Sequence, residues 1–519
     1  MHAIFGTLEK PRFNNITHWL RNAILHVSGY CKLRRFMTDY DWLHSADTIK
    51  RSKKPYAHFD LRTDIGKQAL YISNPHKVAT HGFYPFIHYK IKMTKFNKDE
   101  GISVKERDIC YAAHIDRCIF QYYSFILNRL YNERVLNDGL SDVAIAYRTN
   151  LYKSNIHFSK KAFSFIRMLG DCYIMIGDFT HFFDNLDHKY LKQQWCSLLN
   201  CEYLPDDHYS IFKNITSYSK WELTDLLTLN NLGTDRKGRK SLNQQTRVLT
   251  PTQFKEHRSH IIKNINHYGI PQGSSISAVL ANVYMLEVDK LINDIVAELE
   301  GLYLRYSDDF IIILPSTPQS DITSTFSHIH SILNHTPRLI LEPKKPQYFH
   351  YSNGTLDNCG KSFHSKANER NSSINFLGFT FDGQKVSIRA KTISKYYYRM
   401  YRKAKNIAIA GGFTRKGNHI SCENLYRRYS ERGASRSPGN FLTYVSHAEK
   451  EYGPNEVITR DTKRHMQKIR KALKGKKKTN YKPPPKSFHF RGGFWSEWCD
   501  SNARHPAPKL IRKTFSAHL

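Results

Sequence analysis

The stretch YLRYSDDFIIIL, from Tyr303 to Leu314, places two adjacent acids between two apolar runs. The pattern predicts a buried strand, a tight turn at Asp308 and Asp309, and a second buried strand. Carboxylates avoid such surroundings, because losing their hydration costs free energy unless a partner compensates for it. An isolated pair of acids would most simply cap a turn or pair with basic residues, so the interpretation depends on other motifs.

A third acid ends another apolar run earlier in the chain. CYIMIGD begins at Cys172, ends at Asp178 and is typical of a buried strand. If this strand neighbours those of the first stretch in one sheet, Asp178 and Asp308 face each other. Carboxylates from adjacent strands suit Mg²⁺, and two such ions about 3.5–4 Å apart can activate a 3′-hydroxyl and stabilise a leaving pyrophosphate.

A glycine-rich turn lies between these acids in the sequence. GIPQGSSISAVLAN, residues 269–282, leads into a helix that we predict over residues 278–299, with Tyr284, Val288, Leu291, Ile295 and Leu299 on one face. Glycine lets a ligand approach the backbone closely, and a helix N-terminus favours phosphate. Such turns are common, so the order of the three motifs is the stronger signal.

The composition indicates a polyanionic partner. The 519 residues include 79 Lys and Arg against 45 Asp and Glu, a net charge of +34, which favours nucleic acid over a membrane surface. No apolar run approaches the roughly 20 residues of a membrane span, and the N-terminus lacks a signal-peptide pattern, so we expect a cytoplasmic protein without a membrane partner. The nine cysteines include no C-x-x-C pair, so we expect reduced thiols and no structural zinc.

Together the motifs resemble the palm of a reverse transcriptase. DFTHFFDNLDH, from Asp178, is similar to the first palm motif of group II intron and retron enzymes, GIPQGSSISAVLAN to the second and RYSDDF to the third. LILEPKK at residues 339–345 and FLGFTFDG at residues 376–383 resemble the fourth and fifth motifs, and segments at 107–121 and 146–166 resemble fingers motifs. The stretches KKPYAHFDLR and FLGFTFDGQKVSIRAKTISKYYYRMYRK are similar to bacterial abortive-infection and other defence-associated reverse transcriptases.

The resemblance implies an α+β, right-hand polymerase fold with an antiparallel palm sheet and a helical thumb. We expect an N-terminal extension over residues 1–50 with a helix near residues 17–25, fingers over 51–170 and a palm over 171–389. Within the palm, residues 202–260 form an insert that we expect to be polar and loop-rich, with a basic turn at residues 234–240. A helical, basic thumb over residues 390–482 and a C-terminal tail over 483–519 complete the chain.

The resemblance also assigns roles to individual residues. Asp178 and Asp308 would bridge two Mg²⁺ ions (or Mn²⁺), with Asp309 nearby and the carbonyl of Phe179 completing the shell. The nucleotide contacts would come from Gln272 and Gly273 near the sugar, Lys345 at the pyrophosphate, and Arg107 and Lys105 on the triphosphate. The primer grip would be formed by Phe376, Leu377 and Gly378.

Phe183, five residues after Asp178, falls at the family's steric gate, where an aromatic ring excludes a ribose 2′-OH. The alternative is that Phe183 is an ordinary core residue. If Phe183 is the gate, it predicts that the substrates are dNTPs. RNA-dependent RNA polymerases usually carry an acid at this position, whereas this chain has its acid one residue later, at Asp184. Three departures stand out: Ser307 for the usual Ala or Val, which we expect to matter little, Ala278 for Pro, and Pro346 after Lys345, which puts that lysine in doubt.

The leading hypothesis is an RNA-directed DNA polymerase that serves bacterial antiphage defence and copies a structured non-coding RNA into DNA. Non-templated or protein-primed DNA synthesis by the same active site is a second hypothesis, and a non-catalytic RNA-binding scaffold or maturase is a third. The three acids argue against the last. A second copy of the chain, or a protein partner, is compatible with each hypothesis.

Overall fold

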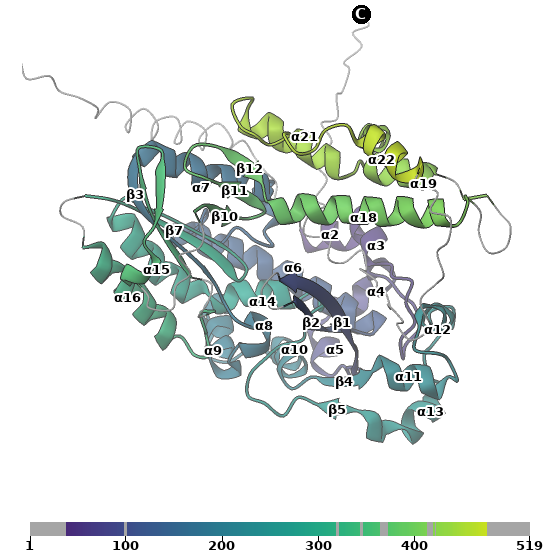
Figure 1. Ribbon diagram of the computed structural model, residues 1–519. Coiled ribbons are helices and arrows are strands. Elements are labelled where there is room, and N and C mark those ends of the chain that lie inside the picture. Colours follow the sequence, from purple (N-terminus) through teal and green to yellow (C-terminus); the bar gives the residue numbers. More distant parts are fainter. Residues whose placement is uncertain are drawn as a thin grey trace, which may run out of the picture.

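The computed structural model describes residues 38–97, 101–317, 321–342, 346–363, 372–412, 419–420 and 422–474 (Figure 1). The helix expected near residues 17–25, the C-terminal tail and Lys345 lie outside the described residues. In the described part of the chain, helices combine with sheets whose strand pairs are antiparallel except for one parallel pair, which confirms the predicted α+β class. Among the described helices, none combines the length and the apolar character needed to cross a membrane.

A five-stranded antiparallel sheet positions the acids. Its order is β6-β7-β3-β8-β9, and all its neighbouring pairs are antiparallel, as we predicted for the palm. The strands are β3 (Asp171–Asp178), β6 (Leu302–Tyr306), β7 (Asp309–Pro315), β8 (Gln347–Ser352) and β9 (Thr355–Asn358). The strand–turn–strand prediction for residues 303–314 is therefore confirmed, and the CYIMIGD strand lies directly beside it.

Both faces of this sheet are covered, which explains why its central strands β3 and β7 are almost continuously apolar. Met175 and Ile312 belong to one core cluster, whereas their neighbours Ile174 and Ile313 belong to another on the opposite face. Alternate residues of a strand point to opposite faces, so a strand buried on both sides loses the alternation of polar and apolar residues.

Helices cover the first face and continue into the fingers. They are α6 (His114–Asn137), α9 (His188–Leu199), α14 (Ser277–Tyr284), α15 (Leu286–Glu298) and α16 (Ile322–His335). The single helix predicted over residues 278–299 is wrong in one respect: it is interrupted at Met285, whose N–H donates to the carbonyl of Asn282, three residues back. Leu291, expected on the apolar face, is 46% exposed, and the neighbouring Ile292 is buried instead.

The second face is covered by α7 (Asn155–Leu169) and a three-stranded sheet of β10 (Ile374–Phe376), β11 (Phe379–Phe381) and β12 (Val386–Ile388). The C-terminal helices follow: α18 (Ala390–Ile409), α19 (Glu423–Tyr429), α20 (Glu431–Ala434), α21 (Phe441–Tyr452) and α22 (His465–Lys474). Figure 1 shows them side by side along the top of the molecule, as expected for a helical thumb.

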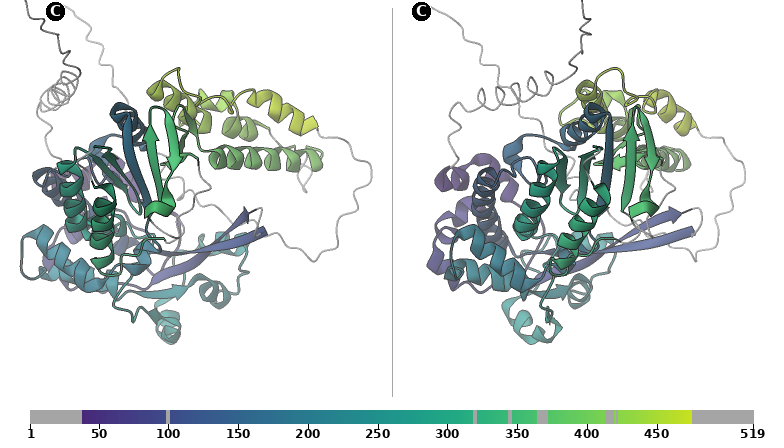
Figure 2. Two further views of the ribbon diagram at one scale, coloured as in Figure 1. Left: turned by 60° about the vertical axis from the view of Figure 1, so that its left-hand side comes forward. Right: turned by 90° about the vertical axis from the view of Figure 1, so that its left-hand side faces the viewer.

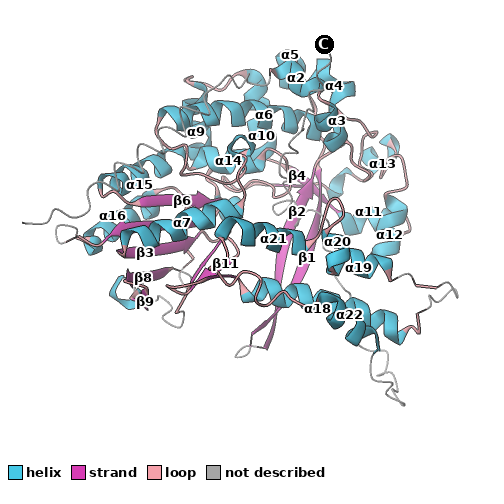
Figure 3. Ribbon diagram, turned by 90° about the horizontal axis from the view of Figure 1, so that it is seen from above, coloured by secondary structure: helices cyan, strands magenta, loops and turns pink. Residues whose placement is uncertain are grey.

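A second sheet, in the order β2-β1-β4-β5, consists of β1 (Phe86–Asn97), β2 (Gly101–Tyr111), β4 (Ser219–Glu222) and β5 (Ile262–Lys263). The long β1–β2 hairpin, which we call the ribbon, extends from the body on the same side as α18 in both views of Figure 2. Figure 3 shows this sheet and the palm sheet as separate units with helices around them.

The segment 202–260 differs from the prediction of a polar, loop-rich insert. It contains α10 (Asp206–Thr216), β4, α11 (Leu223–Leu229), α12 (Arg236–Leu242), α13 (Pro251–Glu256) and η2 (Arg258–His260). The expected basic turn begins α12, because Asp235 caps that helix by accepting the N–H of Gly238. Trp221 and Leu226 bury the segment against the ribbon's base.

The remaining elements are short and surround the start of α6 and the palm. They are α2 (Asp39–His44), α3 (Ala46–Ser52), α4 (Ile65–Ile72), α5 (Pro75–Ala79), η1 (Thr149–Leu151), α8 (Phe182–Asn185) and α17 (Gly360–Phe363). The predicted boundaries between fingers, palm and thumb stay predictions.

Candidate active site

The three predicted acids meet at one end of the palm sheet. Asp178, the last residue of β3, lies directly opposite Asp309, the first residue of β7. Asp308 occupies the two-residue turn before β7, and its carbonyl accepts the N–H of Phe179 at 3.1 Å. Asp309 is exposed and the other two acids are half-buried, so their oxygens remain accessible.

The turn that carries Asp308 is held by one side chain of the hairpin itself and one from outside it. Ser307 has a φ of 61°, a left-handed conformation that costs an L-residue about 1–2 kcal/mol. Arg305 Nη1 donates to the carbonyl of Ser307 at 3.0 Å, and the Tyr147 hydroxyl donates to its Oγ at 3.1 Å. Neither Ala nor Val could accept the bond from Tyr147, so Ser307 adds a contact that the usual residues would lack; how much this matters stays a prediction.

Arg305 is itself fixed by a buried ion pair. Its guanidinium is fully buried and donates to both carboxylate oxygens of Asp289, at 2.8 and 2.6 Å. Tyr303 donates to the same carboxylate, and the pair holds the pKa of Arg305 far above its ordinary value, against the opposing effect of burial. We did not identify this pair from the sequence. The signal was a charged residue inside an apolar strand, where it needs a buried partner.

Phe183 and Gln272 lie on two loops that bond to each other. The carbonyl of Phe183 accepts the N–H of Ile270 at 2.9 Å, and Gln272 Nε2 donates to Asp184 Oδ1 at 2.9 Å. Phe182 is buried in the core, whereas Phe183 is half-buried against it, as a gate residue requires. Since Asp184 engages the amide nitrogen, the amide oxygen of Gln272 is available to accept a bond from a sugar hydroxyl.

The base of the ribbon packs against this loop. Cys110 N–H donates to the carbonyl of Gln272 at 2.8 Å, and Gly273 has a φ of 110°. A Cβ on Gly273 would lie 2.5 Å from the Cys110 carbonyl oxygen, so only glycine permits this approach. Burial raises the pKa of the Cys110 thiol to about 12, which keeps it protonated.

Arg107 and Lys105 are both exposed on β2, where they lie opposite Ile91 and Met93 of β1. Because they are two residues apart on one strand, they lie on the same face of the ribbon. Burial raises the pKa of Tyr147, Asp308 raises it further, and Arg107 lowers it. The contact of Arg107 with the triphosphate stays a prediction. Lys105 lies two residues farther toward the ribbon's tip.

The predicted primer-grip residues form the turn between β10 and β11. Leu377 and Gly378 both have positive φ, 48° and 90°. The Leu377 carbonyl accepts from Asn155 Nδ2 at 2.9 Å, and the Gly378 carbonyl accepts the N–H of Arg389 at 3.0 Å. Phe376, just before the turn, is buried in the second core cluster. The turn is thus tied to α7 and to the start of α18.

A sequence comparison agrees with this arrangement. Residues 126–381 match the family described as reverse transcriptase (RNA-dependent DNA polymerase). This segment belongs to the reverse transcriptase family. The match spans every predicted palm residue named above, from Asp178 to Gly378, together with α7. No curated protein sequence matches the chain.

Solved structures that the chain resembles distantly include telomerases from two Candida species. Apo telomerase from Candida tropicalis is 11% identical, with a TM-score of 0.34 over 77% of this chain and 66% of that one. Telomerase from Candida albicans, in complex with a fragment of telomeric RNA, is 13% identical, with a TM-score of 0.33 over 80% of this chain and 60% of that one. These likenesses are too distant to transfer function, and the chain spans about three fifths of the length of most of these relatives.

Proposed function

We propose that the protein is an RNA-directed DNA polymerase that joins dNTPs at the end of the palm sheet. The observation that carries this proposal is the pairing of Asp178 opposite Asp309, with Asp308 in the adjoining turn. Like charges directly opposite each other in a sheet are destabilising unless a cation offsets them. The family match supplies the class of reaction.

The donor set fits a hard divalent cation. Asp178, Asp308 and Asp309 supply carboxylate oxygens, and Phe179 adds a backbone carbonyl, which are the ligands that Mg²⁺ and Mn²⁺ prefer. When bound, two such ions would lower the pKa of the primer 3′-hydroxyl and offset charge on the leaving pyrophosphate. The chain's own part is to hold these oxygens in place through the turn that Arg305 and Tyr147 support.

Substrate choice depends on Phe183 and Gln272. The ring of Phe183 would occupy the space of a ribose 2′-OH, so dNTPs are selected over NTPs. Gln272 would accept from the sugar through its amide oxygen, while Asp184 holds the amide nitrogen. Arg107, and farther along the ribbon Lys105, would attract the triphosphate by charge. The proposed role of Lys345 at the pyrophosphate rests on the sequence motif alone.

The basic C-terminal helices suit a template–primer duplex. The exposed residues of α18 include basic side chains and two tyrosines: Lys391, Lys395, Arg402, Lys405, Tyr398 and Tyr401. Basic groups bind phosphates without reading sequence, so affinity would fall steeply with salt. The net charge of +34 supports a long nucleic-acid ligand. We propose a structured non-coding RNA as the template, in a bacterial cytoplasm and in antiphage defence, on the strength of the motif resemblance.

The test is synthesis by the purified full chain with its bound nucleic acid. With Mg²⁺ we expect labelled dNTPs, and not rNTPs, to enter a product that DNase destroys and that RNase pretreatment prevents. Asp308→Ala should lower the rate at least about 1,000-fold without changing the melting temperature. A product that survives RNase pretreatment would favour non-templated synthesis, and a product whose migration changes with protease would favour protein priming.

Inactivity of the wild type would contradict the proposal if Asp308→Ala also supported the biological effect equally well. That pair of results would leave the RNA-binding scaffold as the better account. The matched control is Asp294→Ala, an exposed aspartate on α15 that pairs with Lys290 away from the palm turn, and we expect it to keep full activity.

A further inference from the structure

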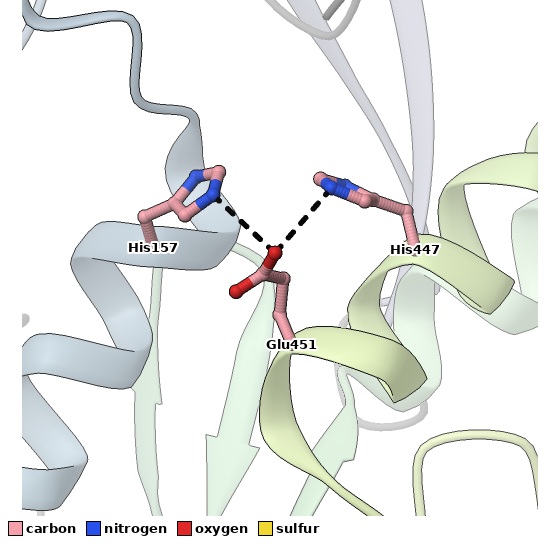
Figure 4. A group of neighbouring side chains, drawn as sticks. All are labelled: His157, His447 and Glu451. Carbon is pink, nitrogen blue, oxygen red and sulfur yellow. Dashed lines mark ion pairs between the residues drawn. The ribbon is translucent and has the colours of Figure 1, made fainter.

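Two helices far apart in the sequence bring a second group of potential metal ligands together. His157 lies on α7, and His447 and Glu451 lie one turn apart on α21, with both rings directed at the carboxylate (Figure 4). Their ligand atoms all lie within 4.8 Å of one another. In the described part of the chain this is the one such group of three His, Cys, Asp or Glu side chains, and it does not include the active-site aspartates.

The distances suit an ion better than direct hydrogen bonds. Glu451 Oε1 is 3.8 Å from His157 Nε2 and 3.7 Å from His447 Nε2. Both separations exceed the range of a hydrogen bond. Ligands bound to one tetrahedral Zn²⁺ at about 2.0–2.1 Å lie roughly 3.3–3.4 Å apart. The two histidine–glutamate distances would therefore shorten by a few tenths of an ångström, and the distance between the two histidine nitrogens, which is within 4.8 Å, by at most about 1.5 Å. The side chains are 30–41% exposed, which leaves a path for an ion.

The protonation states also favour ligation. Burial lowers the pKa of His157, and His447, Lys153 and Lys160 lower it further, while Glu451 acts in the opposite direction. A neutral imidazole is the form that binds a metal. Lys160 Nζ is occupied by the backbone carbonyl of Glu451, so its charge is not directed at the carboxylate.

Ser154 decides which ring nitrogen of His157 is available. His157 Nδ1 accepts the N–H of Ser154 at 3.0 Å and lies 3.1 Å from Ser154 Oγ. With that N–H bond in place, Nε2 carries the proton and faces Glu451. Ligation needs the other tautomer, in which Nδ1 donates to the Ser154 hydroxyl and the lone pair of Nε2 faces Glu451, the usual outer-shell support of a metal-bound histidine. Binding the ion would therefore exchange the bond from the Ser154 N–H for the bond to the Ser154 hydroxyl.

We propose that His157, His447 and Glu451 bind one Zn²⁺ per chain, with water as the fourth ligand. Two imidazoles and one carboxylate suit Zn²⁺ and exclude the harder Mg²⁺ of the polymerase reaction. The sequence led us to expect no structural zinc because the cysteines show no ligand spacing. This ligand set contains no cysteine, and its members come from two helices far apart in the sequence, α7 and α21.

The ion would join the thumb to the primer grip. Two residues before His157, Asn155 donates both to the Leu377 carbonyl and to the hydroxyl of Tyr444 on α21, each at 2.9 Å. One turn beyond Asn155, Ser159 accepts from the Tyr452 hydroxyl at 2.7 Å. The Zn²⁺ site lies between these two bonds along the same helix pair. It would therefore fix α21, and with it the C-terminal helices, relative to the turn of Leu377.

The test measures metal binding directly and does not depend on polymerase activity. The full chain is stripped with chelator, exchanged into buffer and titrated with Zn²⁺ and separately with Co²⁺. We expect the wild type to bind one more ion than His157→Gln or Glu451→Gln, to show the visible absorption of tetrahedral Co²⁺, and to gain a higher melting temperature with Zn²⁺. Because cysteines elsewhere can bind Zn²⁺, the difference between variants is the readout.

His447→Cys separates metal binding from a simple ion pair. Cysteine ligates Zn²⁺ but cannot pair with Glu451 as a cation, so this variant should keep the ion and add a thiolate-to-cobalt absorption band. His328→Gln, which replaces an exposed histidine on α16, is the matched control and should behave as the wild type. Equal ion counts in the wild type and in Glu451→Gln, or a His447→Cys chain without the new band, would overturn the proposal and leave only a proton-dependent ion pair.

Discussion

Two β-hairpins approach the candidate active site, and they are held in opposite ways. The β6–β7 hairpin is short, buried on both faces and fixed at its turn by Arg305 and Tyr147. The ribbon β1–β2 has strands of 12 and 11 residues, and residues 103–108 of β2 are exposed. It is attached at its base, where His88 bonds to Asp108 and Glu222 and where Cys110 meets Gln272.

This difference separates two tasks of a polymerase. The metal ligands must be preorganised, because small displacements of charged groups cost catalytic rate, and a buried network supplies that rigidity. A two-stranded ribbon alone is marginally stable in water, so its outer part can adapt to a nucleotide or template while its base keeps register. The comparison predicts large effects from changes under the short hairpin and smaller, substrate-linked effects at the ribbon's base.

The largest effect should come from Arg305→Met. Removing this guanidinium leaves the carboxylate of Asp289 buried without its cation, which costs about 3–5 kcal/mol of the free energy of unfolding. We expect a large fall in the melting temperature and loss of polymerase activity. Arg436→Met, which breaks an exposed pair with Glu423, should change stability by less than about 1 kcal/mol.

The double variant Arg305→Met, Asp289→Leu tests whether Arg305 does more than stabilise the fold. Replacing a buried pair by apolar residues often restores stability. The Ser307 carbonyl would still lack its donor, so we expect a kcat about 10- to 100-fold below the wild type. Full activity in a double variant of restored stability would show that the turn needs no support from Arg305.

The sequence predicted the palm hairpin well because its physical signals are local. Apolar runs that end at acids identified β3, β6 and β7, and placing these strands in one sheet brought Asp178 to the double acid. The residue directly opposite Asp178 is, however, Asp309 and not Asp308 as we expected, because Asp308 lies in the turn before β7. The support of the turn was missed, because Arg305, Asp289 and Tyr147 meet only through tertiary packing. The group at His157, His447 and Glu451 was likewise invisible, since nothing in the sequence aligns α7 with α21.

The segment 202–260 shows the opposite error. Its polar residues and its Gly suggested loops and a basic turn, yet α12 begins there because Asp235 caps it. Gly238 also packs against the Gly233 backbone, where a Cβ would lie 1.7 Å from the carbonyl oxygen. In a sequence, a glycine that close packing requires looks the same as a glycine in a turn, which is why the helix was missed.

Gly273→Ala should give the next largest effect, now at the ribbon's base. A φ of 110° is unfavourable for alanine, and its Cβ would collide with the Cys110 carbonyl, so the strand must move away from the loop of Gln272. We expect the KM for dNTP to rise about 10-fold or more, corresponding to at least about 1.4 kcal/mol, with a smaller change in kcat.

The matched control for this change is Gly82→Ala, where an added Cβ meets nothing within 4 Å. It should leave stability within about 0.5 kcal/mol and KM unchanged. If Gly273→Ala lowers kcat and leaves the KM for dNTP as it was, the ribbon's base does not position the nucleotide, and the contrast between the hairpins fails at that point.

The smallest effect concerns pH and the histidine under the ribbon. His58 is fully buried and its Nε2 lies 3.2 Å from the carbonyl of Tyr111, at the end of β2, while its buried Nδ1 has no hydrogen-bond partner. Burial lowers the pKa of His58 to about 3. The folded chain therefore keeps this ring neutral, whereas the unfolded chain protonates it near pH 6.5. The contribution of the neutral ring to the free energy of unfolding is complete above that pH and falls as the pH drops below it.

Between pH 7.5 and 5.5 the free energy of unfolding of the wild type should fall by about 1.4 kcal/mol more than that of His58→Gln, which keeps an N–H donor for Tyr111. Chemical unfolding of both proteins at the two pH values measures this difference, and because the other histidines titrate equally in both, identical losses would mean that His58 is not held neutral at the ribbon's base.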